Sequence, residues 1–97
     1  MPKGYWIANN VIRDAEVYET YKISIAPLLA RYGARFLARG GAQRAVEGEL
    51  FPRTVVIEFP SYADACACYD DPAYQKAAAI RQSAAEGRLI IVEGHDP

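Results

Sequence analysis

The spacing of hydrophobic residues changes several times along this chain of 97 residues, and these changes constrain its fold more than any other feature. Alternation typical of strands gives way in two regions to steps of three and four residues, which are typical of helices. Strands are predicted over Gly4–Ile12, Arg35–Gly41, Arg53–Phe59 and Leu89–Glu93. Helices are predicted over Ala15–Tyr32, from Tyr62 to Tyr69 and from Ala73 to about Ala85. The predicted order is β-α-β-β-α-β, with a second helical region in two parts.

Residues at the predicted helix ends support these boundaries. Asp14 is a good N-cap for the first helix, and Gly33 suits the left-handed conformation that ends a helix. Ser61 and Asp64 resemble a capping box, and Asp71-Pro72 combines a cap with a first-turn proline. Gly87 is expected to stop the last helix.

Right-handed crossovers turn this order into a ferredoxin-like plait, an α+β fold with a four-stranded antiparallel sheet and its helices on one face. We expect one domain over residues 1–97. The face away from the helices is expected to carry Leu37, Arg39, Val56 and Glu58, with either the Tyr5 or the Trp6 side of the first strand. Such a mixed surface is typical of a dimer interface, a pocket wall or both, so we expect a homodimer.

Composition excludes several other classes of protein. Eleven basic and twelve acidic residues leave a formal net charge of −1, without the basic surplus of a nucleic-acid binder. No apolar run approaches the roughly 20 residues that span a membrane, and no signal-peptide core follows the N-terminus, so a cytoplasmic location is expected. Cys66 and Cys68 would point about 200° apart on a helix and are not expected to form a disulfide or share a metal.

Five segments resemble the domain of unknown function 1330 family, over nearly the whole chain and in the family's own order. They are Lys3–Ile7, Arg35–Gly41, Pro52–Ser61, Ala67–Gln75 and Ile90–Gly94. The resemblance implies a dimeric α+β barrel, in which two ferredoxin-like sheets pack face to face. The wider superfamily includes cofactor-free monooxygenases, lactone isomerases, polyketide cyclases and haem-binding proteins, and the family itself has no settled reaction. Asn9-Asn10 departs from the family pattern, which has a charged and a β-branched residue there.

Arg39 and Glu58 are the candidate catalytic residues. If the two middle strands pair, both side chains can lie close together on one sheet face. Arg39 would then hold an anionic substrate, and Glu58 would serve as the acid–base group. The alternative is a structural ion pair that specifies how two sheets dock.

Trp6, Tyr69, Tyr74 and Arg81 are the candidate ligand-binding residues. Tyr69 and Tyr74 flank a helix break and are expected either to line a pocket mouth or only to pack. Trp6 is either a pocket wall or an interface anchor. Arg81 either reaches an anion or covers apolar surface with its stem.

The sequence leaves two functions open. One is a binder of a small aromatic or acidic metabolite, with a cofactor-free isomerase, cyclase or monooxygenase as the reaction types considered. The other is a dimeric structural or binding module without catalysis. The one histidine, His95, lies near the C-terminus, and nothing in the sequence requires a metal or an organic cofactor.

Overall fold

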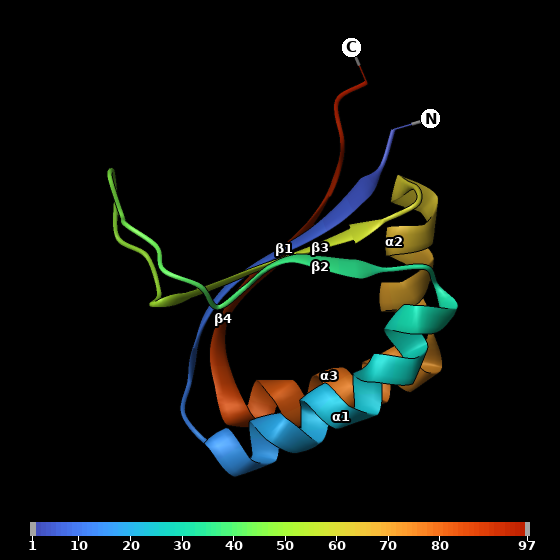
Figure 1. The fold of residues 1–97 in the computed structure, drawn as a ribbon. Coiled ribbons are helices and arrows are strands. Elements are labelled where there is room, and N and C mark those ends of the chain that lie inside the picture. Colours follow the sequence, from blue (N-terminus) through green and yellow to red (C-terminus); the bar gives the residue numbers. More distant parts are fainter. Residues whose placement is uncertain (1, 97) are drawn as a thin grey trace.

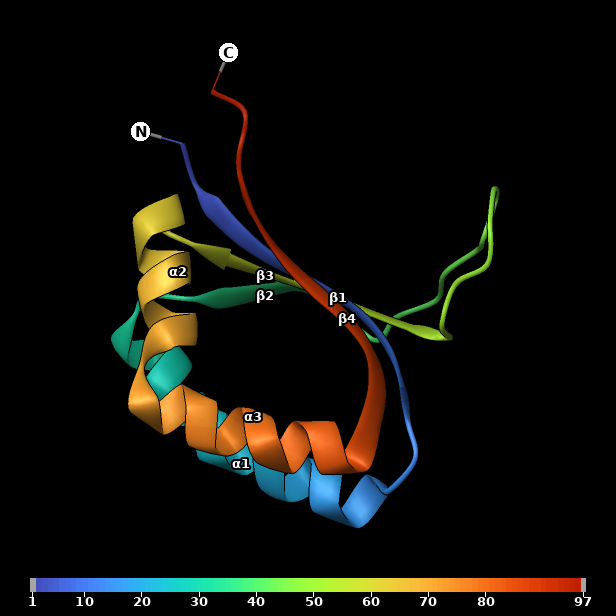
Figure 2. The same ribbon diagram turned by 180° about the vertical axis from the view of Figure 1, so that it is seen from behind.

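A computed structural model describes residues 2–96, so Met1 and Pro97 of the predicted domain lie outside the described residues. The strands are β1 (Gly4–Ile12), β2 (Arg35–Arg39), β3 (Arg53–Phe59) and β4 (Ala85–Glu93). The helices are α1 (Ala15–Arg31), α2 (Tyr62–Asp70) and α3 (Pro72–Ala84). The strands form one antiparallel sheet in the order β2-β3-β1-β4. All three helices lie on one side of this sheet (Figures 1 and 2), so the predicted ferredoxin-like fold is confirmed.

The helix ends follow the local signals in the sequence. The Asp14 carboxylate accepts a hydrogen bond from the Val17 N–H, and Gly33 has a φ of 70° after the end of α1. The Ser61 hydroxyl accepts from the Asp64 N–H at the start of α2. Asp71 ends α2 and caps α3 by accepting from the Ala73 N–H. None of the helices in residues 2–96 is long and apolar enough to cross a membrane.

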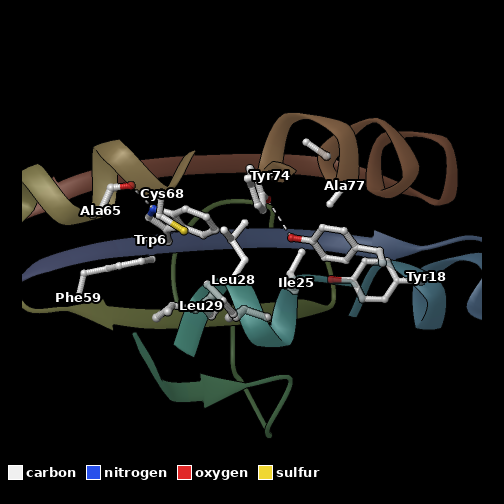
Figure 3. Packing of buried hydrophobic residues seen from close by; sticks show 14 of the residues in the cluster. Trp6, Tyr18, Ile25, Leu28, Leu29, Phe59, Ala65, Cys68, Tyr74 and Ala77 are labelled. Carbon is white, nitrogen blue, oxygen red and sulfur yellow. Dashed lines mark hydrogen bonds between the residues drawn. The ribbon is translucent and has the colours of Figure 1, made fainter. Parts of the chain in front are cut away.

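The hydrophobic core lies between the sheet and the helices and is rich in aromatic rings (Figure 3). Trp6 is 2% exposed, and its indole N–H donates to the Ala65 carbonyl oxygen at 2.9 Å. Its ring centroid lies 5.0 Å from that of Phe59 and 4.8 Å from that of Tyr74. The even-numbered side of β1 therefore faces the helices, and Trp6 joins β1 to α2 and α3.

The face away from the helices is only partly polar. It carries Tyr5 and Ile7 of β1, which alternate with the buried Trp6, and the β4 residues paired with them, Ile90 and Val92. Ile90 is 55% exposed and Val92 is 39% exposed. This sheet face therefore carries exposed apolar side chains, as the sequence predicted, although Arg39 of the predicted set lies on the other face.

Two local predictions were wrong. The β4 strand begins at Ala85, directly after α3, so Gly87 lies inside the strand rather than at a helix end. A Cβ at Gly87 would meet the carbonyl oxygen of Asn9 and lie 2.6 Å from the Cβ of Asn10. Close approach of β4 to β1 is thus the reason for glycine at this position.

The segment of residues 40–52 between β2 and β3 forms an arm without helix or strand, which projects beyond the sheet (Figure 1). The side chain of Asn9 fastens its base, because its Oδ1 accepts from the Phe51 N–H at 2.8 Å. Its Nδ2 donates to the carbonyl oxygens of Phe51 and Arg53 at 2.9 and 3.1 Å. The side-chain amide of Asn9 thus stabilises the base of the arm.

Candidate functional site

A cavity opens on the inner side of the sheet, between the strands and helices α1 and α3. Five aromatic side chains line it: Trp6, Tyr18, Tyr21, Phe36 and Tyr74. Its free volume is about 40 Å³, and a single buried water needs at least about 10–15 Å³. The cavity therefore has room for a small group of a ligand, and the rest of the ligand would lie at the cavity entrance.

Four cationic side chains also line this cavity: Lys22, Arg39, Arg53 and Arg81. No aspartate, glutamate or histidine is among its lining residues. Lys22 forms an ion pair with Glu19 at 3.1 Å. Within residues 2–96, none of the three arginines has a carboxylate within ion-pair distance. The cavity is therefore electropositive and lacks an internal counter-ion.

The two hydroxyl groups of Tyr21 and Tyr74 meet in the wall of the cavity, 2.8 Å apart. Burial raises the pKa of both phenols, so both are neutral near pH 7. Only one of their two protons is used in the bond between them, and either oxygen can be the donor. The pair can therefore donate to a ligand, but it is a poor base.

Arg81 lies on α3 beside this tyrosine pair. Its guanidinium carbon is 6.0 Å from the centroid of the Tyr21 ring, and the guanidinium also bonds the Tyr74 hydroxyl. The Nε atom of Arg81 is buried and has no hydrogen-bond partner in the described part of the chain. A buried guanidinium N–H without an acceptor is costly, and an anion in the cavity would supply that acceptor.

Arg53 and Arg39 approach the cavity from the sheet. Arg53 Nη1 donates to the Tyr18 hydroxyl at 3.0 Å, which holds this guanidinium against α1. Arg39 is exposed and stacks on the Phe36 ring, with its guanidinium carbon 4.1 Å from the ring centroid. The Arg53 guanidinium carbon also lies 5.3 Å from the centroid of the Tyr18 ring. Such contacts with aromatic faces leave N–H groups of both arginines free for a carboxylate.

The predicted pairing of Arg39 with Glu58 is wrong. The register of β2 against β3 shifts between Phe36 and Ala38, which places Arg39 opposite Val55 on the cavity side of the sheet. Glu58 lies on the other face and bonds Arg35, whose Nε is 2.8 Å from its Oε1. Glu58 is therefore not part of the cavity. Arg39 and Glu58 lie on opposite faces of the sheet, so they do not form the catalytic pair that the sequence predicted.

The cavity does bring together most of the predicted ligand-binding residues. Trp6, Tyr74 and Arg81 line it, and Tyr69 lies just behind, with its ring centroid 6.0 Å from that of Trp6. Sequence reasoning missed Asn10, which also lines the cavity. The available signal was that a polar residue interrupts the apolar side of a predicted strand.

The described residues contain no group of three or more histidine, cysteine, aspartate or glutamate side chains that could hold a metal ion. Cys66 and Cys68 are free thiols, as their spacing predicted.

Comparison with known proteins shows which family the chain matches. The family model described as "Domain of unknown function (DUF1330)" matches residues 3–95. None of the curated proteins matches the chain.

Three solved structures of similar fold, each 24% identical or less to this chain, show the fold alone. RPA0582, a protein of unknown function from Rhodopseudomonas palustris, has a TM-score of 0.78 and 24% identity, covering 99% of this chain and 85% of its own. SnoaB, a cofactor-independent oxygenase from Streptomyces nogalater, has a TM-score of 0.64 and 9% identity, covering 100% and 97%. A dimeric ferredoxin-like protein of unknown function from Thermobifida fusca has a TM-score of 0.58 and 18% identity, covering 95% and 89%.

Proposed function

Because the chain belongs to the DUF1330 family, whose name assigns no reaction, we propose its function from the cavity: it binds a small aromatic acid there. The observation that carries this proposal is a set of three arginines, Arg39, Arg53 and Arg81, which form no ion pair within residues 2–96 and line an aromatic cavity without a carboxylate in its described wall. An anion would complete the electrostatics of this site, and a planar ring would pack against its walls.

The contacts favour a carboxylate over a neutral group. A guanidinium donates two parallel hydrogen bonds to a carboxylate, and such charge-assisted bonds are about twice as strong as neutral ones. The partly buried position of Arg81 reduces screening by water, so its attraction for an anion exceeds that of an exposed arginine. The neutral Tyr21–Tyr74 pair adds a further donor.

The same groups limit the chemistry that the cavity supports. Its polar side chains mainly donate hydrogen bonds, so they stabilise negative charge on a bound enolate, phenolate or carboxylate. Glu58, the predicted acid–base group, lies on the opposite face of the sheet. The described wall of the cavity offers neither a carboxylate nor an imidazole as a base, so each of the cofactor-free isomerase, cyclase and monooxygenase reactions considered would need a substrate that ionises without one. The fold is shared with SnoaB, a cofactor-independent oxygenase.

The open sheet face supports a second function, the non-catalytic dimeric module. Ile90 and Val92 are exposed there beside the half-buried Tyr5 and Ile7, and a second copy packing on this face would remove them from water. We propose a homodimer through this face, and a structural neighbour is described as dimeric. A mass of about twice 10.7 kDa by light scattering is expected. Replacing Ile90 with Lys should give the monomer mass while benzoate binding persists.

The binding proposal is tested by isothermal titration with benzoate, the neutral benzamide and acetate. We expect benzoate to bind at least ten times more tightly than either, because only benzoate combines the ring with the charge. Arg81→Met should weaken benzoate binding by more than tenfold, with the fold checked by circular dichroism. Arg35→Met is the matched control, since Arg35 lies on the opposite face. Equal affinity for benzoate and benzamide, or equal losses in the two variants, would contradict the proposal.

A cytoplasmic location stays a prediction from the sequence.

A further inference from the structure

Asn10 is a buried polar residue in the cavity wall, and its side-chain amide oxygen has no partner in the described part of the chain. It is 6% exposed, and its Oδ1 makes no hydrogen bond within residues 2–96. The neighbouring Asn9 points to the other face of the sheet and has all its polar groups engaged by the base of the arm. Two adjacent asparagines thus have different roles, because alternation along β1 sends one to the arm and the other to the cavity.

The position of Asn10 is built closely into the sheet. It lies opposite Gly87 of β4 and Arg53 of β3. A Cβ at residue 87 would lie 2.6 Å from the Asn10 Cβ, so only glycine lets β4 approach at this point. A buried amide oxygen without a partner is uncommon in a native protein, and residues 2–96 supply none for this atom.

Arg81 Nε is the matching unpaired donor in the same cavity. Asn10 Oδ1 can only accept a hydrogen bond, and Arg81 Nε can only donate one. A plain carboxylate satisfies Arg81 but offers no proton to Asn10, and two facing acceptors repel each other. A ligand that satisfies both atoms must carry a hydrogen-bond donor in addition to its anionic group.

We propose that the ligand is a hydroxy- or amino-substituted aromatic acid, whose carboxylate is bound by Arg81 and whose O–H or N–H is recognised by Asn10. This inference rests on the proposed binding of an aromatic acid and adds the group that determines specificity. Asn10 is then a specificity-determining residue, because satisfying its oxygen separates substituted from unsubstituted acids.

The test uses three sets of ligands in isothermal titration: benzoate, the monohydroxybenzoates and the corresponding methoxybenzoates. At least one hydroxybenzoate should bind about tenfold or more tightly than benzoate, and its methoxy analogue, which cannot donate, should lose that gain. In Asn10→Leu, which keeps the size of the side chain, the affinity for the hydroxy acid should fall to that for benzoate. The quantity compared is the ratio of the two affinities, which should approach one in this variant.

Asn9→Leu is the control variant. It should lower stability through the loss of the arm contacts, yet keep the preference for the hydroxy acid over benzoate in protein that remains folded. A hydroxybenzoate preference that survives in Asn10→Leu overturns the inference while leaving the binding proposal intact. A gain from methoxybenzoate instead of hydroxybenzoate also overturns it, since the amide would then be donating. Absence of binding by every acid overturns the proposed function and this inference with it.

Discussion

Removing the hydroxyl groups of Tyr21 and Tyr74, one at a time and together, gives a test of the polar part of the core. Their oxygens are 2.8 Å apart, and within residues 2–96 only the Tyr74 hydroxyl has a further partner, the Arg81 guanidinium. Tyr21→Phe leaves Tyr74 bonded to Arg81, so it should cost about 1 kcal/mol, the net value of one hydrogen bond. Tyr74→Phe leaves both the Tyr21 hydroxyl and the Arg81 donor without that partner, and it should cost about 2–3 kcal/mol.

The double variant should cost less than the sum of the two single changes, because it leaves no unpaired phenol behind. A coupling of about 1 kcal/mol is expected from urea unfolding at pH 7. By melting temperature, each kcal/mol corresponds to about 4–8 °C in a chain of this size. Additive costs, or a larger loss in Tyr21→Phe than in Tyr74→Phe, would refute the reasoning that one of the hydroxyls has a second partner and the other has none.

Two further predictions concern glycine and cysteine positions. Gly87→Ala should destabilise the protein by more than about 2 kcal/mol in urea unfolding, because its Cβ would meet backbone of β1, whereas Gly41→Ala has nothing within 4 Å and should cost nothing or stabilise by up to about 1 kcal/mol. Similar losses at both glycines would contradict the close approach. Burial raises the pKa of Cys68 to about 12. Because the folded protein holds this proton more tightly than the unfolded chain does, the associated stability is present below about pH 9 and is lost as the pH rises from 9 towards 12. Melting temperatures over this range should fall less steeply in Cys68→Ala than in the parent, and equal slopes would contradict the assignment.

Local signals in the sequence predicted the order of elements, since Asp14, Ser61 and Asp71-Pro72 act on backbone groups within a few residues. The start of β4 was missed because pairing with β1, rather than local propensity, extends that strand back to Ala85. Gly87 was misinterpreted because a glycine after a helical stretch is typical of a helix end. Glycine is also typical of close contact between two strands, which is its role here.

The candidate site was predictable only in part. Trp6, Tyr74 and Arg81 were found because large or charged side chains on buried faces stand out in a periodic pattern. Arg53 and Lys22 were missed because they begin a strand and lie on the edge of a helical stripe, positions where a cation is normally solvated. Their common orientation depends on how α1 packs over the sheet, and no spacing in the sequence contains that information.

The side of the sheet on which Arg39 lies follows from one residue in β2. Arg35 and Arg39 are four positions apart, and regular alternation would put both on the open face. The irregularity between Phe36 and Ala38 takes Leu37 out of the pairing, so that Arg35 stays opposite Glu58 while Arg39 moves opposite Val55. One arginine therefore neutralises a carboxylate on the proposed dimer face, and the other adds positive charge to the cavity. Because neighbouring positions on each strand serve opposite faces, dimerisation and ligand binding are expected to respond to different substitutions, as Ile90→Lys and Arg81→Met would show.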